Sequence, residues 1–349
     1  MQKGSASLAF EHAPVITGAA SIVGKKEGQG PLGTYFDVVE EDELFGAESW
    51  EEGESAMQKQ ACLLAMEKAD VEKGDIRYLF AGDLLGQIIA TSFGAVDLEI
   101  PMFGLYGACS TMGEALSLAA MTVAAGYGDK ALAAASSHFA TAEKQFRFPL
   151  GYGNQRPFSA TWTVTGCGAI VISSEEALKK KKKNSSNGQE EKPLAKITGI
   201  TTGKIVDIGA KDSMNMGAAM APAAFDTINR NFVDFHRNET DYDKIITGDL
   251  GEVGKTVLLD FMKQQGRNLE KVYMDCGIEI YDRSQDTHAG GSGCGCSAVT
   301  LCSYILRKIA EKEWKRVLFV PTGALLSTVS FNEGQTIPGI AHGVVIEAV

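Results

Sequence analysis

The stretch IPMFGLYGACSTMGEALSLAAMT, residues 100–122, decides the fold. Its apolar start, residues 100–105, predicts a buried strand, and the Ala- and Leu-rich pattern after Thr111 predicts a helix. Cys109 falls on the turn between them, where the amides and dipole of the helix stabilise a thiolate or a bound anion. The alternative is a buried cysteine that acts only as a small apolar side chain.

The same order of motifs occurs twice in the chain. LFAGDL (79–84) returns as IITGDL (245–250), and GACSTMGEALSLAA returns as GGSGCGCSAVTLCSYIL, which starts at Gly290. ALAAASSH and TGCGAIVIS are likewise echoed by VLFVPTGALLS and AHGVVIEAV. Four matches in one order indicate a duplication, and alternating strands and helices predict mixed sheets covered by helices. We expect two halves, residues 1–178 and 194–349, joined by a charged, solvated linker at 179–193.

Single elements can be placed around this repeat. Apolar spacing predicts a helix over 57–68, and short apolar runs predict strands over 78–81, 130–136 and 163–173. Residues 136–157, SSHFATAEKQFRFPLGYGNQRP, are aromatic, basic and rich in glycine, and we interpret them as a long functional loop.

Composition excludes several classes of protein. A net charge of -11 argues against nucleic-acid binding, which needs a basic face. Seven scattered cysteines without a CxxC pair indicate a reducing compartment and no structural zinc site. We expect no transmembrane segment, because no apolar run approaches the roughly 20 residues needed to cross a bilayer. We also expect no signal peptide, no resident metal and no cofactor.

Long ordered strings in both halves carry a resemblance to a known family. AGDLLGQ, FGLYGACSTMGEAL, MGAAMAPAAFDTI, TGDLGEVG and AGGSGCGCSAV are among them. From about Phe10 to the C-terminus the chain resembles the thiolase and ketoacyl synthase superfamily, and within it the stage V sporulation protein AD (SpoVAD) family. The resemblance implies a five-layered α/β/α/β/α fold of two pseudo-repeated halves.

The resemblance also implies a function. Such a protein of endospore-forming bacteria binds dipicolinic acid (pyridine-2,6-dicarboxylate), alone or as its calcium chelate, during uptake into the forming spore. It implies a homodimer, other SpoVA membrane proteins as partners, and a peripheral place at the inner membrane of the forespore or spore. No DxDxDG loop is present, so we expect any calcium to arrive with the ligand.

A working thiolase or ketoacyl synthase needs more than a thiol. A base must raise the thiolate fraction, and second-half groups must manage the proton and the oxyanion. The places that we match to the synthases' His and Asn, residues 275–278 and 290–293, contain neither residue type. We therefore expect a non-catalytic pocket. The alternative is an acyltransferase with Cys109 as nucleophile and His342 as base.

A flat aromatic dicarboxylate needs an apolar slot and donors at both ends. Phe139, Phe146 and Phe148 are candidates for the slot. Asp249 is expected to cap the helix that follows it, whereas for Asp83 capping and ligand contact both stay open. The candidate ligand-binding residues are Asp83, Cys109, Ser110, His138, Lys144, Arg147, Arg156 and His342.

Overall fold

Two sheets organise the computed structural model, which describes residues 1–146, 155–184 and 193–349. The first-half strands lie in the order β3 (Val15–Gly24), β9 (Gly166–Ser173), β7 (Lys130–Ser137), β5 (Tyr78–Asp83) and β6 (Met102–Gly104). The second-half order is β12 (Tyr273–Asp275), β11 (Lys244–Thr247), β14 (Arg316–Val320), β17 (Gly343–Glu347) and β10 (Ala195–Thr201).

The two sheets share one pairing pattern. β5 is parallel to β7 and β7 antiparallel to β9, just as β11 is parallel to β14 and β14 antiparallel to β17. Residues 195–196 of β10 pair with β3, so the sheets are continuous in hydrogen bonding. At the margins, β1 (Gln2–Lys3) pairs with β2 (Ser7–Ala9), β2 with β10, and β4 (Val38–Glu40) with β3.

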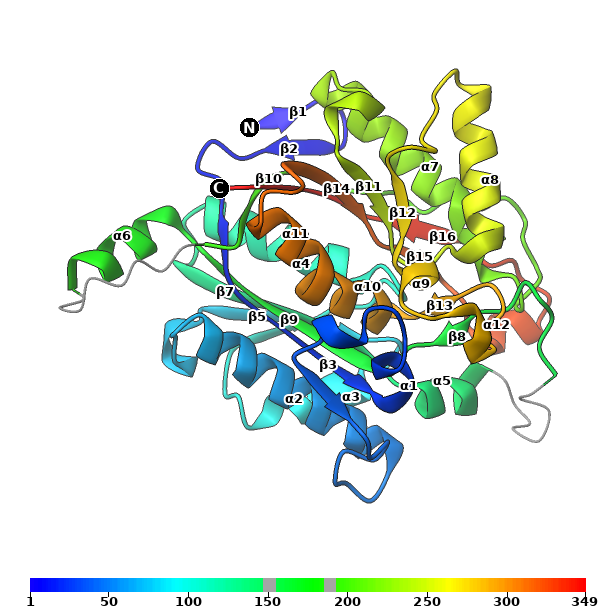
Figure 1. The fold of residues 1–349 in the computed structure, drawn as a ribbon, viewed down its shortest axis with the longest axis horizontal. Helices are drawn as coiled ribbons and strands as arrows, with labels where there is room; N and C mark the ends of the chain where they lie inside the picture. Colours follow the sequence, from blue (N-terminus) through cyan, green and yellow to red (C-terminus); the bar gives the residue numbers. More distant parts are fainter. Residues whose placement is uncertain (147–154, 185–192) are drawn as a thin grey trace.

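Helices form three layers around the sheets (Figure 1). α2 (Trp50–Lys68) and α3 (Ile89–Val96) cover the outer face of the first sheet, and α7 (Met216–Phe235) and α8 (Gly251–Gln264) cover the second. Between the sheets lie α4 (Thr111–Ala124) and α10 (Cys294–Thr300). The expected five-layered, thiolase-like architecture is therefore confirmed.

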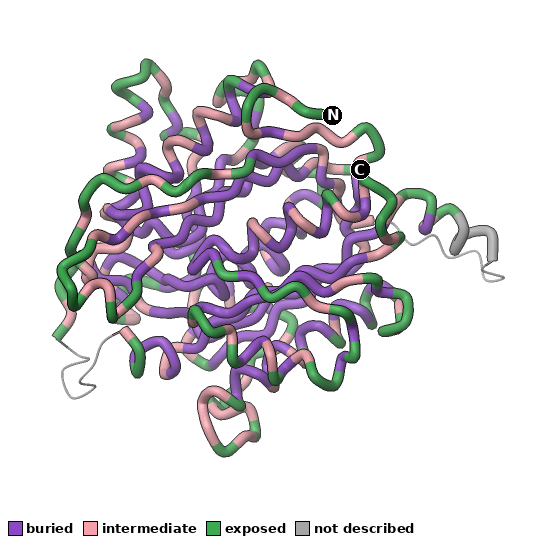
Figure 2. The backbone as a smooth tube through the Cα atoms, turned by 180° about the vertical axis from the view of Figure 1, so that it is seen from behind, coloured by how far each residue is buried: buried purple, intermediate pink, exposed green. Residues whose placement is uncertain are grey.

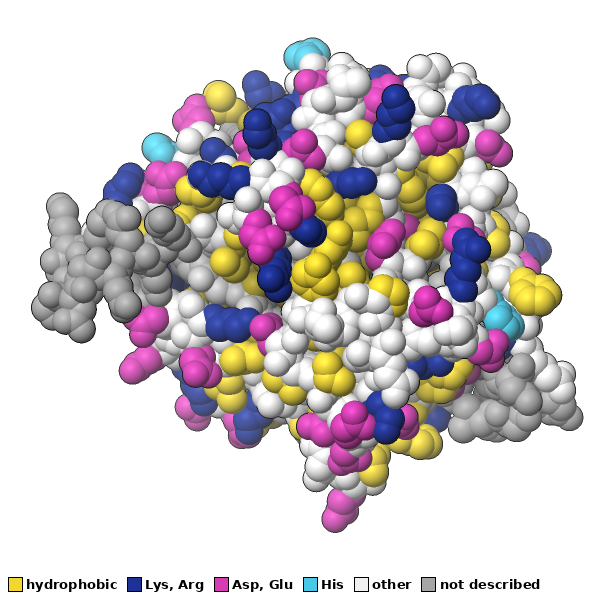
Figure 3. Space-filling view, viewed as in Figure 1, with side chains coloured by type: hydrophobic (Ala, Val, Ile, Leu, Met, Phe, Trp, Pro, Cys, Tyr) yellow, Lys and Arg dark blue, Asp and Glu magenta, His cyan; other side chains and the backbone are white. Residues whose placement is uncertain are grey.

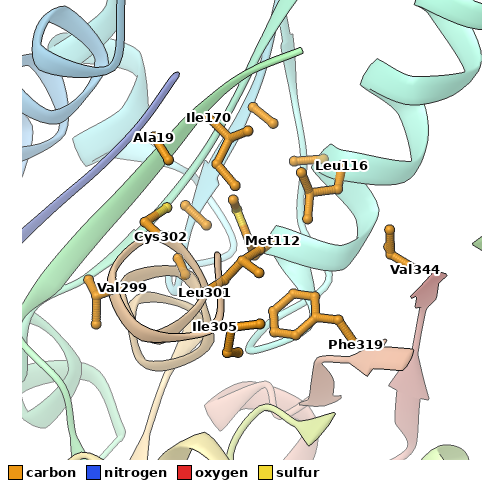
Figure 4. Close-up of a cluster of buried hydrophobic side chains, with 14 of the residues drawn as sticks. Ala19, Met112, Leu116, Ile170, Val299, Leu301, Cys302, Ile305, Phe319 and Val344 are labelled. Atoms are coloured by element: carbon orange, nitrogen blue, oxygen red, sulfur yellow. The ribbon is translucent and has the colours of Figure 1, made fainter. Parts of the chain in front are cut away.

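The hydrophobic cluster with the most buried residues includes the central layer. Met112 and Leu116 of α4 meet Phe319 of β14 and Ile170 of β9, all fully buried (Figure 4). A π-helical turn, Leu301–Ile305, adds Leu301 and Ile305 to the same cluster. Figure 2 shows the strands and central helices buried almost throughout. Both halves thus contribute to one core.

Short elements complete the chain. Two small ribbons frame the centre: β8 (Trp162–Thr163) with β13 (Gly291–Ser292), and β15 (Thr322–Ala324) with β16 (Gly339–Ala341). The remaining α-helices are α1 (Lys25–Gly28), α5 (Phe139–Phe146), α6 (Glu175–Asn184), α9 (Cys276–Glu279), α11 (Leu306–Ala310) and α12 (Thr328–Asn332).

Two expectations, the loop at 136–157 and the strand over 100–105, need correction. The first part of the expected loop at 136–157 is helix α5, whose residues Thr141 and Ala142 are buried. The lysine run 179–183, at the start of the expected linker, lies within helix α6, which projects from the body of the molecule (Figure 1). The strand predicted over 100–105 is shorter, because the β6 ladder with β5 ends with the hydrogen bond from the Leu105 amide to the Ala81 carbonyl.

The surface and the helices bear on possible partners. Within the described ranges, no helix combines the length and the apolar character that a membrane span needs. Figure 3 shows acidic and basic side chains interspersed across the visible described surface of one face.

Candidate functional site

The turn that carries Cys109 is held by local hydrogen bonds. Ser110 Oγ donates to the carbonyl of Gly107 at 2.7 Å, and Thr111 Oγ1 donates to that of Ala108 at 2.7 Å. Ala108 has a φ of 49°, a left-handed conformation that residues other than glycine seldom adopt. Such conformations persist only where the surroundings enforce them. The turn therefore fixes the buried Cys109 just before the first turn of α4.

A strand of the second half packs directly on this turn. A Cβ atom at Gly323 of β15 would lie 2.1 Å from the carbonyl oxygen of Gly107 and 3.3 Å from the amide nitrogen of Cys109. Only glycine permits this approach. The two halves thus meet at the cysteine.

Asp249, between β11 and α8, faces Cys109. The Cys109 thiol and the Asp249 carboxyl are close enough that each shifts the pKa of the other. Ser292 Oγ and the amide of Gly293 donate to Asp249 Oδ2 at 3.1 and 2.9 Å, and Thr322 Oγ1 donates to Oδ1 at 3.3 Å. Asp249 is fully buried, and these three hydrogen bonds hold its carboxyl group in place.

The electrostatics keep the cysteine protonated. Burial, together with the Asp249 carboxyl, raises the pKa of Cys109 well above that of a free thiol. Burial likewise raises the pKa of Asp249 to about 7. A nucleophilic cysteine is activated by a cationic neighbour that stabilises the thiolate, whereas the negative charge of a carboxylate destabilises the thiolate. The arrangement therefore favours a neutral thiol at neutral pH.

A pocket opens above Cys109. Its cavity volume is about 50 Å³, several times the roughly 10–15 Å³ that one water needs. Hydroxyl groups, apolar side chains and two aromatic rings dominate the wall, and among its described residues Glu143 is the one carboxylate and no Lys, Arg or His occurs. The lining residues are Leu84, Tyr106, Ala108, Cys109, Ala142, Glu143, Phe146, Thr161, Thr163, Ser213, Met216, Ser292, Ala324 and Leu326.

Two sequence-predicted residues, Cys109 and Phe146, lie in this wall. Asp83 lies outside it, one residue before the lining residue Leu84. Asp83 Oδ1 accepts from the amide of Leu85 at 3.0 Å, and Oδ2 accepts from the amide and hydroxyl of Thr91 at 2.9 and 2.8 Å. Asp83 thus fixes the start of α3, so of the two open roles the structure shows the capping one.

The other predicted polar residues have partners elsewhere. Ser110 is used within its own turn, and His138 bonds the carbonyl of Glu43 through Nε2 at 2.8 Å. Lys144 pairs with Glu51 at 2.9 Å on the surface. None of the three lines the pocket.

The remaining aromatic and basic candidates from the first-half segment also lie apart. Arg156 donates to Asp286 Oδ2 at 3.1 Å and lies over the ring of Trp162. Phe139 also stacks on Trp162, and the centroids of the two rings are 4.0 Å apart. Arg147 and Phe148 lie outside the described residues.

His342 does not line the pocket either. Its Nδ1 accepts from the amide of Gly203 at 3.3 Å, and burial lowers the pKa of the ring to about 4. A histidine with so low a pKa is a weak base, which counts against its expected role in an acyltransferase.

The residue opposite Cys109 was not predicted. The expectation that Asp249 caps α8 is wrong, because Asp275 accepts from the amides of Leu250 and Gly251 at 2.9 and 3.1 Å. Asp275 also caps α9 through the amide of Ile278 at 3.2 Å. Residues 275–278 therefore do not face the thiol. The signal that could have found Asp249 was its place at the end of a second-half strand, shared with Asp83 in the repeat.

Comparison with solved structures supports the fold. The human mitochondrial 3-ketoacyl-CoA thiolase in complex with CoA matches with a TM-score of 0.59 at 12% identity, over 98% of this chain and 99% of that one. The 3-oxoacyl-[acyl-carrier-protein] synthase III of Aquifex aeolicus matches with a TM-score of 0.55 at 12% identity, over 96% and 99%. At these identities the likeness shows the thiolase-type fold alone.

Sequence comparison identifies the family. The family model described as stage V sporulation protein AD (SpoVAD) matches residues 4–347. Stage V sporulation protein AD of Bacillus subtilis (strain 168) is 43% identical over 344 residues, which cover 99% of this chain and 97% of that protein. This chain therefore belongs to the stage V sporulation protein AD family.

Proposed function

We propose that this sporulation protein binds dipicolinic acid, or its calcium chelate, in the Cys109 pocket and supports its uptake into the developing endospore without catalysing a reaction. The observation that carries the proposal is the raised pKa of the buried Cys109 beside Asp249, which opposes the thiolate that an acyltransferase needs. The pocket retains the hydroxyl donors and aromatic walls that a small planar ligand needs.

The wall chemistry suits a flat acid with an aromatic ring. Tyr106 and Phe146 supply ring faces, while Thr163, Ser213 and Ser292 supply hydroxyl groups. Within the described ranges, no group of three His, Cys, Asp or Glu residues is arranged to hold a metal ion. Calcium therefore enters the proposal as part of the ligand.

Isothermal titration of the purified protein with dipicolinate tests the proposal. Cys109→Ala should retain the fold and bind about fivefold to tenfold more weakly, because it removes the sulfur that contacts the ligand in the pocket wall. Lys59→Ala on the outer face of α2, whose Nζ pairs with Asp97, serves as a control and should bind like the wild type. Wild-type affinity in Cys109→Ala, together with wild-type affinity in Asp83→Ala, would remove this pocket from consideration.

The enzymes of the same fold support a second candidate, an acyltransferase that uses Cys109. It requires a thiolate, and the raised pKa of Cys109 opposes one. Mass spectrometry after incubation with acyl-CoA discriminates the two functions, since stable acylation of Cys109 would favour the enzyme.

A role at the inner spore membrane requires docking, because the described residues include no membrane-spanning helix. The proposed docking partners are other SpoVA proteins, with this chain bound peripherally as a homodimer. Co-purification from sporulating cells, with and without those membrane proteins, tests the association.

A further inference from the structure

Asp249 lies behind Cys109 and Ser292, two lining residues that we call the pocket floor. Its hydrogen-bond donor Ser292 and its neighbour Cys109 both line the cavity, while Asp249 itself has no exposed surface. The other two donors, Gly293 and Thr322, belong to the surrounding backbone and ribbon. A ligand that contacts Cys109 and Ser292 would therefore interact with Asp249 only through these two side chains.

The hydrogens on this floor are limited in number. A serine hydroxyl and a cysteine thiol each carry a single hydrogen to donate. While Asp249 is ionised, the Ser292 hydrogen is used on its carboxylate, and only lone pairs of Ser292 Oγ are left for the cavity. A ligand carboxylate placed there would meet acceptors rather than donors.

Protonation of Asp249 reverses the direction of one bond. A neutral carboxyl group can donate its O–H to Ser292 Oγ, since the two oxygens are 3.1 Å apart. The Ser292 hydroxyl is then free to donate to a ligand carboxylate. One added proton thus converts the pocket floor from acceptor to donor.

Among the described residues, no cationic side chain faces Asp249. The titratable groups that face it are Cys109, Asp275 on β12, Cys276 on α9, and Cys294 and Cys296 on α10, none of them cationic. The described pocket wall adds the carboxyl of Glu143 and no Lys, Arg or His. Burial already raises the pKa of Asp249 to about 7, so a modest further shift protonates it.

We propose that Asp249 is a ligand-recognition residue that takes up one proton from solvent when the dicarboxylate binds and relays a hydrogen bond through Ser292 to the ligand. The inference rests on the proposed function. One O–H bond forms on Asp249, the proton comes from water or buffer, and no other covalent bond changes. Binding therefore consumes protons and weakens as the pH rises above 7.

Calorimetry measures this proton uptake directly. Titrations with dipicolinate in buffers of different ionisation enthalpy, at pH 6 and pH 8, give the number of protons bound per ligand. With a midpoint of about 7 in the free protein and a protonated complex, we expect about 0.1 proton at pH 6 and about 0.9 at pH 8. A parallel titration with the calcium chelate should give the same difference if its carboxylate meets the same floor.

Variants locate the proton. Asp249→Asn should lower the uptake at pH 8 to near zero, and Ser292→Ala should lower both affinity and uptake. Glu54→Gln removes a buried carboxyl that is outside the pocket wall and should retain wild-type uptake.

The outcomes separate this inference from the function on which it rests. Wild-type binding without proton uptake at pH 8 would overturn the role of Asp249 and leave dipicolinate binding intact, even if Asp249→Asn does not fold. Unchanged uptake in a folded Asp249→Asn would also overturn it. Absence of binding by the wild type under all conditions would instead refute the proposed function.

Discussion

Single residues of the site differ in how far the sequence predicts them. Cys109 could be placed because a strand, a turn and a helix follow one another within 23 residues of chain. Asp249 could not, because its contact with Cys109 spans 140 positions and depends on how two sheets pack. Lys144 and Arg156 were expected in the pocket because they are basic residues of the first-half segment. In the structure, Lys144 pairs with Glu51 and Arg156 pairs with Asp286 instead.

At the same scale, Glu54 should make stability depend on pH. Burial and the neighbouring charge of Asp83 raise the pKa of Glu54 to about 8, above the 4.5 of an exposed glutamate. The folded state thus binds more protons than the unfolded state between these values, so stability should fall as the pH rises from about 4.5 to 8. Glu54→Gln removes this contribution and should flatten the dependence.

Urea unfolding of the wild type and Glu54→Gln from pH 5 to pH 9 measures the difference. Glu67→Gln, an exposed position on the same helix α2, is the matched control and should retain the wild-type slope. Parallel curves for the wild type and Glu54→Gln would show that the carboxyl titrates normally in the folded protein.

Elements were predictable where local pattern and tertiary contacts agree. The helix expected over 57–68 is the C-terminal part of α2, which begins earlier because Ser49 caps it through the amide of Glu52. Helix α5 was not predicted, because residues 136–157 as a whole are rich in glycine and aromatic residues, a composition typical of a loop. Its buried face rests on a contact far along the chain, between Thr141 and Glu54.

The edge of the first sheet makes a prediction at this scale. β6 pairs only with β5 in the described structure, and Phe103 on it is 54% exposed. On the adjacent α3, Phe93 and Val96 are 68% and 64% exposed. An unpaired edge strand beside apolar side chains is a surface that another copy of the chain can cover, as the proposed homodimer requires.

Phe93→Glu should therefore shift the protein from dimer to monomer, because it introduces a charge into the apolar contact. Sedimentation equilibrium over a range of protein concentrations measures the change. Phe158→Glu, at an exposed position packed beside His288, controls for the loss of a surface aromatic ring and should leave the oligomeric state unchanged. A wild-type protein that is monomeric throughout would contradict the dimer.

For the whole molecule, the repeat of motifs in the sequence corresponds to two sheets with the same pairing pattern. The sequence did not predict that hydrogen bonds join the two sheets. Strands β3 and β10 pair across the halves, and Tyr281 of the second half donates to the buried Glu27 of the first. The core around Met112 and Phe319 also draws on both. The pocket lies at this junction, which explains why its two central residues come from different halves.

A shared core predicts that the halves unfold together. Phe319→Ala empties a fully buried site in the central cluster and should cost about 3–5 kcal/mol. Trp50 on α2 reports on the first half and Trp314 before β14 reports on the second. Single-tryptophan versions should show coincident thermal transitions in the wild type, both lowered equally by Phe319→Ala. If only the Trp314 transition moved, the second half would unfold independently, and the pocket would lose half of its wall while the first sheet remained folded.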